Sequence, residues 1–269
     1  MFYKDLIKSS KNEYNAKYLL KNHIKLTNDE LNNKKNIPIL KLLKFNIALI
    51  KSKKKPLQYI VGTVNFYGYE YKVNKNVLIP RFETEQLVEE TIKLIKKDFK
   101  DKRITLLDLG TGSGCIGITI KKELKNIDVT LSDISKEALK IAKFNAKNEN
   151  IRIIKSNLFE NINKKYDVII SNPPYLSYNE PVEDIVKNNE PNIALYAKNK
   201  GLYYYEEILK YSKRFLKDKY IIAFEIGLSQ AQNIIKIANK YLDNINFLIK
   251  KDLNEKDRIL IITNFWNNI

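Results

Sequence analysis

Short apolar runs alternate with helix-like segments over the last two thirds of this 269-residue chain, and this alternation limits the fold more than any other feature. The apolar runs have the length of buried strands. We expect an α/β fold of the Rossmann-like type, in which a mostly parallel seven-stranded sheet is covered by helices on both faces. A short polar segment joins the last two runs, so a final antiparallel strand is also predicted. The expected strands are 104–109, 127–132, 151–155, 166–171, 220–226, 246–250 and 258–263, and the expected helices are 115–124, 136–147, 202–216 and 229–242.

The chain before residue 104 has a different pattern, which predicts two further units. Residues 1–55 carry apolar side chains at helical spacing, and Thr27 to Glu30 is typical of a capped helix start. This helical domain has no motif with assignable chemistry, so we expect it to serve as a docking surface. Over 56–79, aromatic and apolar residues alternate with polar ones, and Gly62 and Gly68 interrupt the pattern, which predicts a linking β-hairpin. The expected domains are therefore 1–55, 56–79 and 80–269.

A glycine-rich loop follows the first predicted strand of the sheet. Glycine tolerates positive φ and lets a ligand approach the backbone, and the loop runs directly into a helix, as nucleotide-binding loops do. The same glycines satisfy the dinucleotide fingerprint, so an NAD site is an alternative, and Asp133 after the next strand suits the ribose of either ligand. Asp108 at the strand end suits a cationic amino-acid group, which favours S-adenosylmethionine. Four of the eight glycines of the chain lie in this loop: Gly110, Gly112, Gly114 and Gly117.

Asn172-Pro173-Pro174-Tyr175 follows the apolar run 166–171 and therefore lies at a carboxyl end of the predicted sheet, where open α/β folds bind ligands. Two prolines remove two backbone donors, so we expect the Pro173 carbonyl to point outward without a local partner. That carbonyl and the Asn172 carboxamide oxygen form a pair of acceptors suited to both hydrogens of an –NH2 group. The ring of Tyr175 is expected to pack over the planar group that carries it. An ordinary turn after a strand is the alternative.

The composition excludes several classes of function. Cys115 is the only cysteine and His23 the only histidine, which excludes a disulfide framework and a Cys/His zinc site and leaves no histidine for hydride chemistry. The formal net charge of +17 fits a polyanionic partner, but only five of the 48 basic residues are Arg, which is typical of codon bias in an A/T-rich genome. No run approaches the ~18 apolar residues that span a bilayer, and the first residues lack the apolar core of a signal peptide. We expect a cytoplasmic protein that needs neither a metal nor a membrane.

The glycine loop and the Asn-Pro-Pro-Tyr motif together resemble those of the class I S-adenosylmethionine-dependent methyltransferases that modify amino groups in planar systems. Further stretches narrow the resemblance to the release factor glutamine methyltransferase family, the HemK/PrmC type. The resemblance extends from about residue 56 to the end, with a matching helical domain before it. Beyond the two motifs, it rests on Pro56–Gly62, Phe66–Gly68, Leu78–Glu85 and Asn189–Pro191 with Ala194–Leu195.

The resemblance implies a role for each matching position. Asp133 would bind the ribose of S-adenosylmethionine, and Asn157 and Leu158 would lie beside the adenine. Because the family often has an acidic and then an aromatic residue at these two positions, Leu158 is expected to cover the ring by apolar contact without stacking. Phe82 stands where the family often has proline. The implied cofactor loop is Gly110, Thr111, Gly112, Ser113 and Gly114, and the implied catalytic and substrate-binding residues are Asn172, Pro173, Pro174 and Tyr175, of which Asn172 also borders the cofactor.

The implied substrate is the glutamine of the Gly-Gly-Gln loop in class I peptide chain release factors, so direct nucleic-acid binding is not required. If Asn172 and Pro173 accept both amide hydrogens, charge on the attacking nitrogen is stabilised without a strong base. From the residues alone, only a planar –NH2 substrate follows, and a ribosomal protein glutamine or an adenine or guanine of RNA or DNA remains an alternative. A helical binding protein with an inactive methyltransferase-like half is another. Glu190 is expected either to shape the pocket or to lie on the surface.

Overall fold

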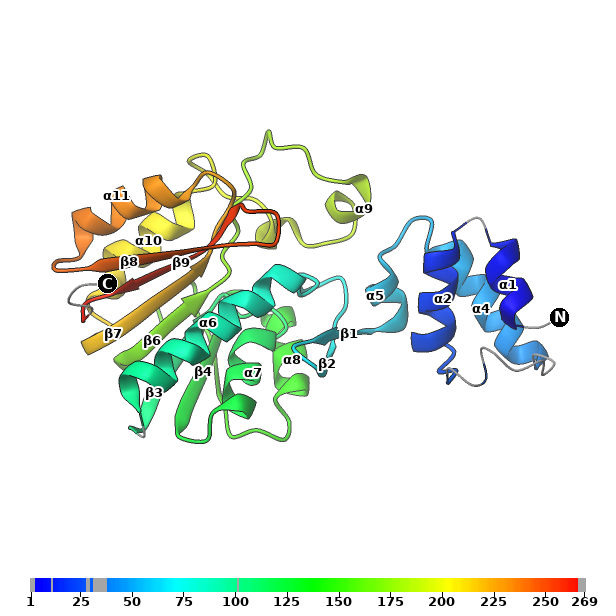
Figure 1. Cartoon of the computed structure of the whole chain (residues 1–269), viewed down its shortest axis with the longest axis horizontal. Coiled ribbons are helices and arrows are strands. Elements are labelled where there is room, and N and C mark those ends of the chain that lie inside the picture. The colour runs from blue at the N-terminus through cyan, green and yellow to red at the C-terminus, as the bar shows by residue number, and fades with distance from the viewer. Residues whose placement is uncertain (1–2, 11, 28–29, 31–37, 101, 266–269) are drawn as a thin grey trace.

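The computed structural model describes residues 3–10, 12–27, 30, 38–100 and 102–265 (Figure 1). Within these residues the chain forms one seven-stranded sheet in the order β5-β4-β3-β6-β7-β9-β8. Neighbouring strands are parallel except at β9, which runs antiparallel to both β7 and β8. The prediction of a mostly parallel sheet with one antiparallel strand is confirmed. The strands are β3 (Ile104–Leu109), β4 (Ile127–Asp133), β5 (Arg152–Lys155), β6 (Tyr166–Ser171), β7 (Leu216–Glu225), β8 (Asn246–Lys251) and β9 (Asp257–Thr263).

Helices cover both faces of the sheet, as Figure 1 shows. One face is covered by α6 (Phe82–Phe99), α7 (Cys115–Glu123) and α8 (Lys136–Asn145), and the other by α10 (Tyr203–Ser212) and α11 (Ala231–Tyr241). Side chains along each strand alternate between these layers: Leu106 lies in the first core with Ile118, and Leu107 lies in the second with Ile208. Because both faces of these strands are buried, both alternating sets of side chains are apolar, and each strand appears in the sequence as a continuous apolar run.

One predicted boundary moves by several residues. The expected helix 202–216 ends at Ser212, and β7 begins at Leu216, before the expected residue 220. Leu216 is buried and pairs with Tyr166 of β6, but the partly exposed Lys217 and Lys219 and the exposed Asp218 follow it. Because these residues are polar, a search for apolar runs places the start of the strand too late.

The predicted hairpin is confirmed only in part. The strands β1 (Thr63–Phe66) and β2 (Tyr69–Lys72) pair antiparallel, but Leu57–Val61 before them is a helix, α5, and not a strand. The apolar residues of this short segment fit one turn of helix as well as a strand, and Pro56 before it and Gly62 after it, at φ 87°, are typical of helix ends. The hairpin packs on the sheet unit, since Phe66 and Tyr71 are buried in the core that α6 and α7 share.

A separate apolar cluster holds the N-terminal helices α1 (Tyr3–Ser9), α2 (Glu13–Asn22) and α4 (Ile39–Lys51) together. Leu57, Ile60 and Val61 of α5 pack against this cluster, whereas Tyr59 packs against Val77 on the side of the hairpin, so α5 contacts both units. Thr27 and Glu30 exchange hydrogen bonds as a capping box does, and the helix expected after them lies outside the described residues. The boundaries at 55 and 79 stay a prediction.

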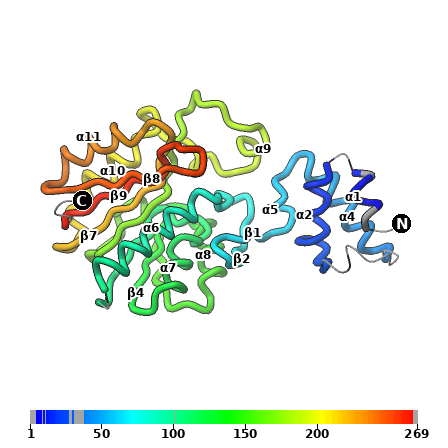
Figure 2. Tube along the Cα trace, viewed as in Figure 1, coloured from blue at the N-terminus to red at the C-terminus, as the bar shows by residue number. Residues whose placement is uncertain are grey.

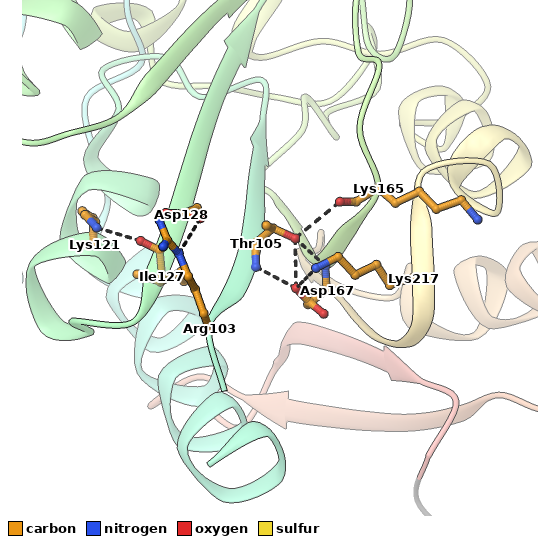
Figure 3. Close-up of polar contacts among 8 residues, drawn as sticks. All are labelled: Arg103, Thr105, Lys121, Ile127, Asp128, Lys165, Asp167 and Lys217. Carbon is orange, nitrogen blue, oxygen red and sulfur yellow. Dashed lines mark hydrogen bonds and ion pairs between the residues drawn. The ribbon is translucent and has the colours of Figure 1, made fainter. Parts of the chain in front are cut away.

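Polar contacts join the strands at the edge where they begin, drawn in Figure 3. Oδ2 of Asp167 accepts hydrogen bonds from the backbone N of Thr105 at 2.7 Å, from its hydroxyl at 2.9 Å and from Nζ of Lys217 at 2.7 Å. One carboxylate of β6 therefore holds β3 and β7. Arg103 and Asp128 form an exposed bidentate pair at 2.9 Å beside it, which lowers the pKa of Asp128 through the hydrogen bond from Arg103.

Candidate active site

A cavity lies at the opposite edge of the sheet, where the chain leaves the carboxyl ends of β3, β4 and β6. It is a partly open cavity, and the empty space in and above it, open solvent included, is about 1060 Å³. The connection from β5 to β6 crosses β4 and β3, so the strand order reverses direction beside β3 and the cavity lies at the topological switch point of the sheet. Predicted site residues that line it are Gly110, Thr111, Gly112, Ser113, Asp133, Asn157, Leu158, Asn172, Pro173 and Pro174.

The glycine loop is held by β4. Gly110 and Thr111 donate backbone hydrogen bonds to the Ser132 carbonyl at 2.9 Å, and the backbone N of Gly112 donates to Oδ2 of Asp133 at 2.8 Å. Gly112 has φ 56°, and no atom lies within 4 Å of the place a Cβ would occupy. Glycine is therefore used here for its backbone conformation, and it leaves the loop open to a ligand.

Asp133 has a structural role that the sequence pattern did not reveal. Oδ1 of Asp133 accepts a hydrogen bond from the backbone N of Ser135 at 2.8 Å, at the start of α8, while Oδ2 accepts the one from Gly112. Burial raises the pKa of Asp133, and the backbone donors of Ser135 and Gly112 lower it. A carboxylate has about four lone-pair positions, so Asp133, which lines the cavity, keeps acceptor capacity for a hydroxyl group there.

Asp108 does not face the cavity, contrary to the expectation that it would meet a cationic group. It is fully buried, and Oδ2 accepts from the Thr111 hydroxyl at 2.5 Å and from the backbone N of Gly117 at 2.9 Å. Gly117 fits there because a Cβ would come within 2.4 Å of Leu131. Gly114 is also absent from the cavity wall, and its φ of 84° serves the turn into α7.

Asn157 and Leu158 border the cavity beyond β5. Leu158 adopts φ 46°, an uncommon conformation for a leucine, and its carbonyl accepts a hydrogen bond from the Ser156 hydroxyl at 2.7 Å. Asn157 donates from Nδ2 to Glu160 at 2.7 Å. The turn thus places an apolar side chain against the cavity at the position where the resemblance expects the adenine.

Asn172, Pro173 and Pro174 line the cavity directly after β6. Asn172 donates from Nδ2 to the hydroxyl of Thr84, at 3.3 Å, which leaves Oδ1 without a hydrogen bond among the described residues. Within the same part of the chain, no hydrogen bond ends on the Pro173 carbonyl. The two acceptors expected from the sequence are both available.

Tyr175 lies outside the cavity wall, so its expected packing over the substrate is not what the structure shows. Its ring packs on the core beneath α10 and α11, and its hydroxyl donates to Oε1 of Glu225 at 3.3 Å. Its carbonyl accepts from Gln230 at 3.0 Å. Burial and the neighbouring Glu225 raise the pKa of Tyr175 far above its ordinary value. The rigid turn of the two prolines directs the next side chain inward.

Sequence reasoning missed two positions around the motif and left a third undecided. Thr84 and Glu225 lie under Asn172; Thr84 falls within the Leu78–Glu85 stretch but was given no role from it, and Glu225 belongs to no recognisable pattern. Glu190 is not a surface residue: its side chain is fully buried, Oε1 lies 2.6 Å from Nη2 of Arg81, and Oε2 accepts from the backbone N of Ile79 at 3.0 Å. It thus supports the wall that Pro191 and Ala194 form.

The wall residues suit S-adenosylmethionine in shape and in chemistry. Backbone at Gly110 and Gly112 is open to close approach, Asp133 brings a carboxylate to the cavity wall beside the loop, and Leu158 is apolar. A Rossmann-like sheet whose one antiparallel strand lies between β7 and β8, with this loop after its first strand, defines the class I S-adenosylmethionine-dependent methyltransferases. The chain is an enzyme of this class, and its cofactor is S-adenosylmethionine.

Comparisons with known proteins narrow the class to a family. A model described as methyltransferase small domain matches residues 84–190. A release factor glutamine methyltransferase of Fusobacterium nucleatum subsp. nucleatum is 40% identical over 269 residues, covering 96% of this chain and 70% of the relative. The chain belongs to the release factor glutamine methyltransferase family.

Two other relatives extend the comparison. A bifunctional methyltransferase of Rickettsia typhi is 42% identical over 230 residues, which are 77% of this chain and 44% of that protein. A solved methyltransferase from Pyrococcus furiosus shares the fold, with a TM-score of 0.54 at 18% identity over 84% of this chain and 98% of its own.

Two further properties concern only the described residues. None of their helices is both long and apolar enough to cross a membrane. In the same part of the chain, no three His, Cys, Asp or Glu side chains gather so that they could hold a metal ion.

Proposed function

We propose that this protein transfers a methyl group from S-adenosylmethionine to the side-chain amide nitrogen of the glutamine in the Gly-Gly-Gln loop of class I peptide chain release factors. The observation that carries the proposal is the pair of available acceptors, Oδ1 of Asn172 and the Pro173 carbonyl, on the wall that the glycine loop also lines. The name of the Fusobacterium relative supports the substrate. A translation protein as substrate also favours a cytoplasmic location.

In this proposal the cavity has a cofactor side and a substrate side. Gly110 to Ser113 hold the amino-acid part and Asp133 the ribose hydroxyls, while Asn157 and Leu158 border the adenine. The cofactor supplies an electrophilic methyl group. Asn172 and Pro173 hold the glutamine amide on the other side, and Pro174 keeps the Pro173 carbonyl in place because its ring stiffens the backbone.

The acceptor pair answers the main chemical difficulty of the reaction. An amide nitrogen is a weak nucleophile because its lone pair is delocalised into the carbonyl. Two acceptors on its hydrogens stabilise the positive charge that develops as the nitrogen takes the methyl group, and they aim the lone pair. The nitrogen then loses one proton to water, so the enzyme needs no imidazole, and His23 lies in the N-terminal helical unit away from the cavity.

An exocyclic amine of adenine or guanine would satisfy the same two acceptors, and the net charge of +17 favours such an alternative. The test is to incubate the protein with labelled S-adenosylmethionine and, separately, a class I release factor, ribosomal protein and RNA. We expect label on the glutamine of the release factor, located by mass spectrometry. Label on RNA alone would refute the glutamine substrate.

The same assay tests the acceptor pair. We expect Asn172→Ala to lower kcat by at least about a hundredfold, because one acceptor in the transition state is lost, while the Kd for S-adenosylmethionine changes little. Asn163→Ala, which truncates an exposed asparagine before β6, is the control and should keep full turnover. Unchanged turnover of Asn172→Ala would remove the acceptor mechanism.

A further inference from the structure

A buried carboxyl group lies beneath the Asn172-Tyr175 motif. Glu225 is the last residue of β7, next to the end of β6, and it is 1% exposed. Its Oε2 accepts the hydroxyl of Thr84 at 2.6 Å, and its Oε1 accepts the hydroxyl of Tyr175 at 3.3 Å. Thr84, in the first turn of α6 and 2% exposed, in turn accepts Nδ2 of Asn172 at 3.3 Å. One carboxyl group is thus connected to both ends of the motif.

These contacts have a direction. The Asn172 amide nitrogen can only donate, so Thr84 Oγ1 is the acceptor in that bond and uses its own hydrogen for Glu225. With Nδ2 fixed toward Thr84, the other half of the carboxamide, Oδ1, is left as the free acceptor of a residue that lines the cavity. A carboxamide that lacked this anchor would rotate, since its two ends are nearly equal in size, and would then offer a donor where the substrate needs an acceptor.

We propose that Thr84 and Glu225 are positioning residues for methyl transfer: they fix the Asn172 carboxamide so that its oxygen, and not its nitrogen, meets the glutamine amide. This rests on the proposed function. Thr84 borders the cavity, but its hydroxyl is taken by Glu225 and Asn172, and Glu225 is absent from the cavity wall, so neither polar group is placed to bind the amide in this scheme. Their contribution therefore passes through Asn172 alone.

Three variants of α6 separate positioning from packing. Thr84→Val keeps the shape and removes the hydroxyl, and Thr84→Ser restores it. Thr91→Val is the matched control, because Thr91 is a buried threonine of the same helix whose hydroxyl donates only to the Leu87 carbonyl, at 2.7 Å. We expect Thr84→Val to lower kcat about tenfold or more, with KM for the release factor and Kd for S-adenosylmethionine nearly unchanged. Thr84→Ser should recover most of the rate, and Thr91→Val should keep all of it.

The orientation of the Asn172 side chain can also be followed by NMR without substrate, so this test does not depend on the proposed function. The side-chain NH2 signals of Asn172 in a ¹⁵N NMR spectrum can be assigned as the pair that disappears in Asn172→Asp, because aspartate has no side-chain NH2 group. We expect them to shift in Thr84→Val and to return near their wild-type position in Thr84→Ser. Signals that do not move in Thr84→Val would overturn the positioning role, as would a kcat loss equal to that of Thr91→Val. A wild-type enzyme that leaves the release factor unlabelled would instead refute the proposed function, while the NMR result would stand.

Discussion

Asp108 is the carboxyl group whose titration the fold perturbs most clearly. Burial raises its pKa from 3.8 to about 6, although the bonds from Thr111 and Gly117 lower it, and Oδ1 has no hydrogen-bond partner in the described part of the chain. As pH rises, the unfolded chain loses this proton first, so between about pH 4 and 6 the folded state holds more protons and is destabilised. The shift corresponds to about 3 kcal/mol.

Asp108→Asn removes this ionisation and keeps an acceptor for Thr111 and Gly117. We expect the free energy of unfolding of the variant, relative to wild type, to rise by about 3 kcal/mol between pH 4 and pH 7, as measured by urea unfolding. Both proteins share all other titrating groups, so the difference isolates this carboxyl. A difference that stays flat across this range would show that Asp108 titrates normally.

At this scale, the sequence predicted the residues whose chemistry is local. Gly110, Gly112 and Asn172 reach the cavity because strand ends and backbone conformation place them there. Strand ends are recognised in the sequence by apolar runs, and backbone conformation by glycine and proline. Thr84 and Glu225 could not be predicted, since their partnership joins positions 141 residues apart through the packing of α6 on β7. The inward side chain of Tyr175 was misjudged because a motif does not say which way its last ring turns.

Among the elements, β6 depends on one carboxylate where the strand begins. Asp167→Ala leaves the Thr105 N–H and Lys217 without their acceptor, and we expect it to reduce the free energy of unfolding by about 2–3 kcal/mol. Because this edge is opposite the cavity, kcat should stay unchanged. Chemical unfolding and turnover are the two measurements.

The control lies beside it in Figure 3. Asp128→Ala breaks the exposed pair with Arg103, and such pairs contribute less than about 1 kcal/mol. If Asp167→Ala cost no more than Asp128→Ala, the buried contacts would not hold the three strands.

The elements themselves followed from periodicity where both faces of a strand are buried, as in β3 and β6. The helix α5 was taken for a strand because five residues are too few to distinguish a period of two from one of 3.6. The start of β7 was predicted too late because its first residues after Leu216 are polar and reach solvent, so they interrupt the apolar pattern.

Over the whole molecule, the segment between the motif and α10 is tied back to the earlier part of the chain. Figure 2 follows it from β6 through α9 (Asp184–Lys187) toward α5. Asn189 donates to the Lys54 carbonyl at 2.9 Å, next to the Glu190 contact with Arg81. This tether joins the N-terminal helical unit to the cavity wall.

Glu190→Ala should therefore affect both stability and cofactor binding. It leaves the partly exposed Arg81 and the Ile79 N–H unpaired, and we expect a loss of about 2–3 kcal/mol in the free energy of unfolding. The loosened wall should raise the Kd for S-adenosylmethionine severalfold, measured by calorimetry. Glu183→Ala, at an exposed acid of the same segment, should change neither quantity; equal effects of the two variants would contradict this role of Glu190.

The position of β9 has a consequence for the order of assembly during synthesis. Strand β9 is made after β8, yet it lies between β8 and β7, with Ile259 and Ile261 buried. A growing chain that has reached only Lys251 can pair neither β8 nor the open side of β7 in their final places. The nascent protein therefore carries a bare, apolar sheet edge, of the kind that aggregates or needs a chaperone, until Asp257–Thr263 have left the ribosome.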